Sequence, residues 1–319
     1  MKSKKLLSTI LALLLVLTSI PVFMLPVSAE EQKVAYIGTD TETLLTFADA
    51  IEAANAATED VTITLAANAT LTAQQKINNT NAKKVTINGN GKTITSSVDG
   101  YAFVFQTAGE VQNLTLNCKL GFDLQTTNMT LKTVTLTASQ DTAVKVSSTS
   151  DATADQSITV DGCTITTNRQ TSGNCPCIAL YTNNPVTVDV IDSTLNYTGA
   201  QASNGSNNNS SVILVSKNTG NTTDDATVNL KGNTVLNFSP AGVPKQKMVG
   251  VLRVNASCVG EFNIESTVTI KQNCAVASYG YNCFASVDGT CTINDEGAKW
   301  VATPAALKKG VALPSQTGY

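Results

Sequence analysis

The sequence predicts an all-β fold in which short strands form a stack of repeated units, preceded by one short helix. Runs of alternating apolar and polar residues, which are typical of strands, recur at intervals of roughly 20 to 40 residues along most of the chain. Turns rich in Asn, Gly, Ser and Thr separate these runs. Because a single unit cannot bury its apolar side chains alone, the units are expected to stack on one another.

The chain begins with a segment that is typical of a secretory signal peptide. Lys2, Lys4 and Lys5 precede an apolar run, and the small residues of Val27-Ser28-Ala29 follow it. We therefore expect residues 1–29 to be removed, which leaves a mature chain that is secreted or exposed at the cell surface and has no membrane span. The alternative is that the apolar run remains as a membrane anchor.

Residues 30–59 are expected to form an N-terminal cap that includes a helix at residues 46–57. Phe47, Ala50, Ile51 and Ala54 are spaced to give one apolar stripe, and Thr46 is a suitable N-cap. The helix directly precedes the first unit, so it would cover the apolar end of the stack. A helix that binds a partner is the alternative.

Residues 60–301 carry the repeated units. The clearest example is Val85-Thr-Ile-Asn88, which is followed by a turn of Asn and Gly and then by Thr93-Ile-Thr95. Most units add a further strand downstream, so that each unit holds about three short strands. These further strands are expected at residues 101–105, 121–124, 142–146, 177–181, 212–215 and 251–254.

Long polar insertions interrupt the later units. Three of them, at residues 167–176, 198–211 and 239–247, fall between the same two strand positions. They are expected on one side of the stack, either as a wall beside a binding surface or as decoration without a role. Residues 302–319 are expected to form a C-terminal tail.

Alignment on the polar residue that ends the first run of each unit predicts a column of polar side chains. Its members are Asn88, Gln112, Lys132, Asp161, Asp189, Asn229, Asn263 and Asn294. Asp161 and Asp189 would then be neighbours, and such a pair binds Ca²⁺, acts as an acid–base pair or shares solvent at a turn. A row of threonines that includes Thr159 and Thr187 is expected to face outward, where it binds carbohydrate or ice or is simply favoured on an exposed strand.

Composition narrows the class of partner. The chain has 319 residues, a formal net charge of −3 and only 14% charged residues, so there is no electrostatic reason to expect nucleic acid as a partner. The abundance of Thr, Ser and Asn instead predicts a neutral, hydrogen-bonding surface that suits a glycan or another surface partner. Histidine is absent, which excludes His-dependent catalytic triads and His metal sites.

The repeats resemble the right-handed parallel β-helix family, the pectate-lyase-like solenoids. Residues 85–94 carry the resemblance most clearly, and Val111-Gln-Asn-Leu-Thr-Leu116 and Val160-Asp-Gly-Cys-Thr-Ile165 reinforce it. The resemblance covers most of the mature chain and implies a single-stranded, right-handed parallel β-helix with a short N-terminal capping helix. Because this family includes polysaccharide lyases, glycoside hydrolases, phage tailspikes and adhesins, the fold alone does not decide the function.

The resemblance also directs attention to a small set of candidate catalytic residues. Pectate-lyase-like enzymes use Ca²⁺-binding carboxylates with an arginine or lysine base, whereas polygalacturonase-like relatives use a histidine that this chain lacks. Arg253, Asp123 and Lys145 are the candidates, because they are expected to face outward from one sheet. They would serve a Ca²⁺-dependent lyase acting on acidic glycans, or they form a row of weak ion pairs. Apart from Ca²⁺, no cofactor is expected.

The eight cysteines permit disulfides in an exported chain. Cys274 and Cys283 flank one loop, and Cys258 and Cys291 occupy corresponding places in successive units, so both pairs are predicted to form disulfides. A bridge from Cys163 to the Cys175-Pro-Cys177 segment is also expected. Buried, unpaired thiols are the alternative.

These observations together favour a secreted or surface-exposed protein that is not an enzyme and that acts in adhesion or carbohydrate binding. The sequence shows no assembled catalytic cluster, and its composition predicts a neutral surface that is rich in hydroxyl groups. A polysaccharide lyase acting on acidic glycans and a purely structural surface component are the alternatives.

Overall fold

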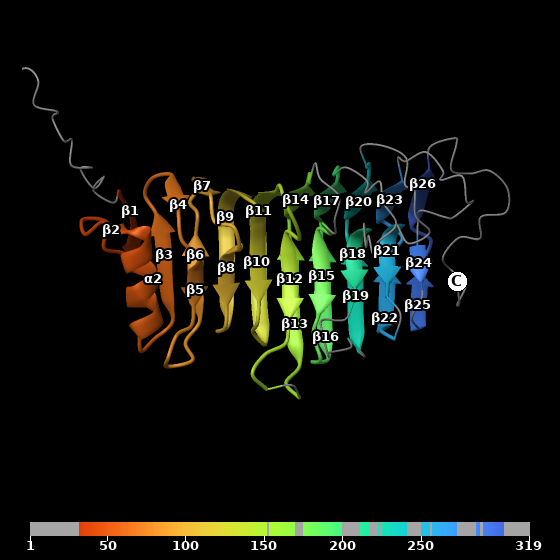
Figure 1. Ribbon diagram of the computed structural model, residues 1–319, viewed down its shortest axis with the longest axis horizontal. Coiled ribbons are helices and arrows are strands. Elements are labelled where there is room, and N and C mark those ends of the chain that lie inside the picture. The colour runs from red at the N-terminus through yellow and green to blue at the C-terminus, as the bar shows by residue number, and fades with distance from the viewer. Residues whose placement is uncertain are drawn as a thin grey trace, which may run out of the picture. The chain divides into compact units, whose positions relative to one another are not determined.

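The computed structural model is rich in strands, many of which are parallel and lie in a stack (Figure 1). It describes residues 32–151, 153–169, 175–199, 211–216, 223, 225–240, 250–255, 257–272, 285–287 and 290–302. The predicted signal peptide and residues 303–319 of the predicted tail lie outside these ranges. The arrangement is all-β and compatible with a β-helix or solenoid, and its elements belong to one structural unit that begins at Lys33.

The strands form three columns, and the first and second belong to one sheet of 18 strands. In the first column, each strand pairs in parallel with the strand one unit before it, as Val85 with Val61 and Thr130 with Glu110. The first column comprises β3 (Val61–Leu65), β6 (Val85–Asn88), the first halves of β9 (Gly109–Cys118) and β11 (Asn128–Ala138), then β13 (Gln156–Asp161), β16 (Val186–Ile191), β19 (Ala226–Lys231), β22 (Val259–Ile264) and β25 (Thr290–Asp295).

The second column follows the first after a short bend. β9 and β11 contribute to both columns, and each bends at a residue with positive φ, Asn113 (52°) in β9 and Thr133 (53°) in β11. The remaining members are β4 (Ala69–Leu71), β7 (Thr93–Ser96), β14 (Thr164–Thr167), β17 (Thr194–Tyr197), β20 (Val235–Phe238), β23 (Thr269–Gln272) and β26 (Lys299–Ala302). The predicted turn between β6 and β7 uses positive φ angles at Asn90 (49°) and Gly91 (72°).

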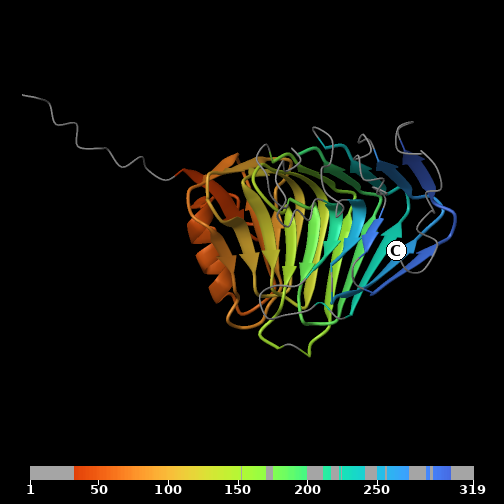
Figure 2. The ribbon, with the colours of Figure 1, turned by 45° about the vertical axis from the view of Figure 1, so that its right-hand side comes forward.

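The third column is a separate sheet of eight strands, seen beside the first two in Figure 2. Its members are β5 (Gln75–Ile77), β8 (Tyr101–Phe105), β10 (Leu120–Leu124), β12 (Val144–Ser147), β15 (Ile178–Tyr181), β18 (Ser211–Val215), β21 (Gly250–Val254) and β24 (Ala285–Val287). Six of these are the further strands that the repeats predict. The three insertions predicted on one side all connect a second-column strand to a third-column strand, although most of their residues lie outside the described ranges.

Two strands and a helix precede the first unit. β1 (Lys33–Ile37) pairs antiparallel with β3 and with β2 (Leu45–Thr46), a pairing that the repeats did not predict. The helix α2 (Phe47–Ala56) begins at Thr46, whose Oγ1 accepts a hydrogen bond from the backbone N–H of Asp49 at 3.1 Å. The four residues of its predicted apolar stripe are all buried, and the ring of Phe47 meets that of Phe103 edge to face at 6.1 Å.

The core consists of apolar rows that run from unit to unit between the sheets. One row contains Ile63, Ile87, Val111, Leu131, Val160, Val190 and Leu230, which are in register and fully buried. Aromatic rings stack in the same way, with Phe103 and Phe122 at 5.5 Å and Tyr197 and Phe238 at 4.9 Å between ring centroids. Because side chains alternate along a strand, the residues between these rows face outward and can form the functional surface.

Candidate functional site

Two of the three predicted catalytic candidates lie together on the outward face of the third column. Asp123 of β10 is directly opposite Lys145 of β12, and the Lys145 Nζ atom is 3.7 Å from Asp123 Oδ2. Asp123 is only 6% exposed, and it also accepts hydrogen bonds from Ser147 Oγ at 2.6 Å and from Gln125 Nε2 at 3.0 Å. The carboxylate is therefore held by three partners.

Lys145 approaches two tyrosine rings, that of Tyr181 on the adjacent strand β15 and that of Tyr101 on β8, two strands away on the other side. Its Nζ atom is 5.6 Å from the centre of the Tyr101 ring and 6.0 Å from that of Tyr181. Burial raises the pKa of Tyr101 well above its ordinary value, and the negative charges of Asp141 and Asp123 raise it further, so its phenol is neutral. The two aromatic rings and Asp123 together fix the position of the Lys145 side chain.

Arg253 of β21 is not part of this cluster. It continues the same row, but three strand steps lie between it and Lys145, through Ala179 and Leu214, which amounts to about 14 Å. Arg253 is 1% exposed, and its Nε donates to Asn255 Oδ1 at 2.5 Å. The three candidates therefore share one sheet, as expected, but Arg253 lies about 14 Å along the row from Lys145.

The predicted column of polar side chains on the first column of strands is in register for four residues, and the fifth predicted member lies in a different row. Asn88, Gln112, Lys132 and Asp161 are in register, but Asp161 is opposite Ile191, and Asp189 is opposite Thr159. The predicted contact of Asp161 with Asp189 is therefore wrong. Thr159 and Thr187 likewise occupy different rows, because Thr187 is opposite Ser157.

The cause of the shift is the position of the motif in the strand, because Asp161 is the last residue of β13 whereas Asp189 is followed by two more residues of β16. The inward residues of β16 are Val186, Val188 and Val190, so Asp189 stands within the strand and not at its end. The following turn sets the register, since Gly162 N–H donates to Ile191 O at 3.0 Å and Thr164 pairs with Thr194. Alignment of the repeats on this turn would have given the observed register.

The shift creates a hydrogen-bonded ladder on the later units. Asn294 donates to Asn263 at 2.7 Å, Asn263 donates to Asn229 at 2.9 Å, and Asn229 donates to Asp189 at 2.8 Å. Lys231 Nζ also contacts Asp189, at 2.9 Å. The amides satisfy one another and end on a charged acceptor, which is an arrangement that stabilises the stack.

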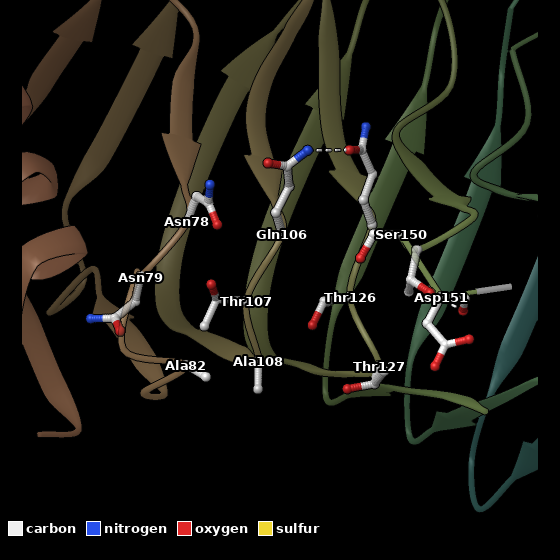
Figure 3. A pocket seen from close by; sticks show the side chains of 12 residues that line it. Asn78, Asn79, Ala82, Gln106, Thr107, Ala108, Thr126, Thr127, Ser150 and Asp151 are labelled. Atoms are coloured by element: carbon white, nitrogen blue, oxygen red, sulfur yellow. Dashed lines mark hydrogen bonds between the residues drawn. The ribbon is translucent and has the colours of Figure 1, made fainter. Parts of the chain in front are cut away.

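A groove lies where the third-column strands of four consecutive units bend back toward the first column (Figure 3). Its volume is about 300 Å³, and its twelve lining residues carry amides, hydroxyls and a single carboxylate. They are Asn78, Asn79, Ala82, Gln106, Thr107, Ala108, Gln125, Thr126, Thr127, Thr149, Ser150 and Asp151. A concave surface with convergent polar groups is the usual form of a small-ligand site.

Several hydrogen-bonding groups of the groove are available to a ligand. Within the described part of the chain, no residue makes a hydrogen bond with the hydroxyl of Thr107, Thr126 or Ser150, or with the side-chain amide of Asn78. Thr107 and Thr126 are 8% and 3% exposed, so their positions are fixed by packing. Fixed donors and acceptors bind a polyhydroxylated ligand with little loss of conformational entropy.

The groove is connected to the Asp123–Lys145 cluster by a relay of amides. Gln106 Nε2 donates to Gln125 Oε1 at 2.7 Å, the contact drawn in Figure 3, and Gln125 Nε2 donates to Asp123. The relay fixes both amide orientations and leaves Gln106 Oε1 as an acceptor. The sequence analysis did not predict the groove. A polar pair after the third-column strand of successive units, such as Gln106-Thr107 and Gln125-Thr126, is a recurrent signal for it.

A more regular threonine surface than the predicted one lies on the outward face of the second column. Two rows run in register there. One row contains Thr93, Thr115, Thr135, Thr164 and Thr194, and the other contains Thr95, Asn117, Thr137, Thr166 and Asn196. The first-column row is less uniform, because Glu110 and Asp189 interrupt it.

The predicted disulfides within the described part of the chain are not formed. Cys163, Cys175, Cys177 and Cys291 carry free thiols. Cys163 Sγ lies at the bend after the first column, 3.3 Å from Leu131 O, whereas Cys177 Sγ is 3.3 Å from Asn196 O in the second column. Cys291 is opposite Gly260, two residues beyond Cys258. The predicted Cys274–Cys283 pair lies outside the described residues.

No group of three or more Cys, Asp or Glu side chains in the described part of the chain is arranged to hold a metal ion. Within the same residues, no helix has the length and apolar character needed to cross a membrane.

Comparison with known proteins adds no further assignment. No family model, no curated protein and no solved structure matches the chain.

Proposed function

We propose that this chain is a secreted or cell-surface protein of the right-handed parallel β-helix type, and that it acts in adhesion by binding a glycan without cleaving it. The observation that carries the proposal is the groove of about 300 Å³ with its available hydroxyl and amide groups. Glycans present many hydroxyl groups that both donate and accept, so a set of fixed, neutral hydrogen-bonding groups is complementary to them. The parallel stack and the weakly charged composition support the same function.

A polysaccharide lyase is the second candidate, and the Asp123–Lys145 contact is the observation that favours it. A lyase base must lie within reach of the proton that it removes from the substrate. Lys145 is held against a buried carboxylate and two aromatic rings, and it does not line the groove in which a substrate would bind. The contact therefore supports a positioning role for Lys145 more than a role as a base.

The test uses the purified chain and a panel of immobilised neutral and acidic glycans. Retention on at least one glycan is expected, without release of unsaturated uronate ends in the presence of Ca²⁺. Thr107→Val and Thr126→Val remove one groove hydroxyl each at nearly constant volume and should weaken retention several-fold. Thr137→Val, an outward position on the second column, is the matched control and should leave retention unchanged.

Three outcomes separate the candidate functions. Release of uronate ends would establish a lyase and overturn the proposal of a non-catalytic protein. Retention that the groove variants leave unchanged would move the binding surface elsewhere on the stack. Absence of retention on every glycan would favour a purely structural surface component.

A further inference from the structure

The length of the groove sets the size of a ligand that fills it. Its lining residues come from four consecutive units, at residues 78–82, 106–108, 125–127 and 149–151. Neighbouring parallel strands are about 4.8 Å apart, so three spacings amount to about 14 Å. This distance exceeds the size of one sugar ring, and the groove runs along the stack, across the strands. An oligosaccharide lying along the stack therefore fits it better than a monosaccharide.

The charge of the groove is set by one residue. Asp151 is the only charged side chain among the lining residues, and none of them is basic. Its Oδ1 accepts hydrogen bonds from the Thr153 backbone N–H at 3.0 Å and from Thr153 Oγ1 at 2.8 Å. These bonds lower the pKa of Asp151, so the group is a carboxylate at neutral pH. Its Oδ2 has no hydrogen-bond partner in the described part of the chain.

The cation of the Asp123–Lys145 cluster is not part of the groove. Lys145 lies behind the amide relay, in contact with Asp123 and between two tyrosine rings, and it does not line the groove. A uronate bound in the groove would meet Asp151 without a basic partner among the lining residues, and like charges at short range repel. An uncharged sugar meets no such penalty.

We propose that the groove takes an oligosaccharide of uncharged sugars and that Asp151 excludes acidic glycans from it. This inference rests on the proposed function, because it names the class of glycan that the same groove binds. It also distinguishes the groove from a lyase site for acidic glycans, which would need cationic groups to hold the substrate carboxylates.

The experiment measures the binding of fluorescently labelled hexasaccharides to the purified chain in solution. Neutral and acidic members are compared in pairs of the same linkage, namely glucose with glucuronate, galactose with galacturonate and mannose with mannuronate. In the pair that binds best, we expect the neutral member to bind at least about tenfold more tightly at low salt and the difference to shrink at high salt. The corresponding neutral monosaccharide should bind more weakly than the hexasaccharide.

Asp151→Asn is the decisive variant, because asparagine keeps an oxygen that can accept from Thr153. It should raise the affinity for the acidic member about three- to tenfold and leave the neutral member nearly unchanged. Asp155→Asn makes the same charge change at an exposed position that does not line the groove, and it is the matched control. Thermal unfolding of both variants checks that the fold is retained.

The outcomes distinguish this inference from the proposed function. An acidic member that binds as tightly as its neutral counterpart, or more tightly, would overturn the inference and leave glycan binding intact. Equal effects of Asp151→Asn and Asp155→Asn would overturn the role of Asp151. Absence of binding to every hexasaccharide, together with absence of retention on the immobilised panel, would overturn the proposed function and this inference with it.

Discussion

Gln106 and Gln125, on consecutive units of the third column, are joined by a hydrogen bond of 2.7 Å from Nε2 of the first to Oε1 of the second. Because Gln125 also donates to the buried Asp123, both of its side-chain groups are occupied and its orientation is fixed. The two hydrogen bonds therefore fix the orientation of the Gln106 amide in the groove wall relative to the buried Asp123 carboxylate. They connect the packing of the stack with the surface that we propose binds a glycan.

Gln125→Ala should weaken glycan binding several-fold, since it frees the Gln106 amide to rotate. It should also lower the free energy of unfolding by about 1 kcal/mol, because Asp123 loses one donor. Titration with the retained glycan and urea unfolding measure the two effects. Gln140→Ala, at an exposed position outside the groove, is the control, and a Gln125 variant that matches it in binding would refute the role of the relay.

Gly121→Ala should destabilise the third column. A Cβ atom at Gly121 of β10 would overlap the carbonyl oxygen of Ala143, whereas one at Gly100 would meet only Gln74 Nε2 at 3.5 Å. Overpacking against backbone is expected to cost about 1–3 kcal/mol. Urea unfolding should therefore show a lower midpoint for Gly121→Ala and little change for Gly100→Ala. Equal midpoints for the two variants would show that the strands separate easily at this point.

Asp189 should contribute to the acid sensitivity of the fold. Burial raises its pKa, but the hydrogen bonds from Lys231 and Asn229 lower it more, so the pKa lies below its ordinary value. A carboxyl group of this kind stabilises the folded state above an unfolded pKa of about 3.9, and the contribution is lost as pH falls through the folded pKa.

Asp189→Asn should therefore reduce the loss of unfolding free energy between neutral pH and about pH 3. Urea unfolding at several pH values measures this loss. Asp155→Asn, the same charge change at an exposed site, should follow the wild-type pH profile. If both variants gave the wild-type profile, the ladder that ends on Asp189 would have no role in acid unfolding.

The buried thiols should be unreactive in the folded protein. Burial raises the pKa of Cys163 to about 11 and that of Cys177 to about 12, so almost no thiolate is present at neutral pH. Alkylation followed by mass spectrometry should find Cys163 and Cys177 unmodified in the native chain and modified after unfolding without a reductant. Resistance to alkylation after such unfolding would instead indicate disulfides and contradict the free thiols.

Much of the fold follows from local patterns in the sequence. Alternation identifies the strands, and the spacing of Phe47, Ala50, Ile51 and Ala54 gives the buried face of α2, because periodicity determines which side chains share a face. The placement of Asp123 and Lys145 on one sheet was predicted for the same reason. These features depend only on residues within one unit or in two adjacent units.

A single four-residue motif could not predict which residues of successive units lie opposite each other. Asp189 ends the same four-residue motif as Asp161, yet β16 continues beyond it, so the two residues lie in different rows. The expected pairing of Cys258 with Cys291 failed for a different reason: Asn263 and Asn294 are in register as predicted, and this register places Cys291 opposite Gly260, two residues beyond Cys258. The groove was missed because its walls come from bends of four units, and the polar pair that each unit contributes indicates a groove only when the units are stacked.

The most direct test of the account is hydrogen–deuterium exchange of the chain with and without the glycan that it retains. We predict added protection at residues 106–108, 125–127 and 149–151, which line the groove, and none on the outward threonine rows of β14 and β17. Protection confined to the threonine rows, or binding that protects no segment of the groove, would contradict the central claim.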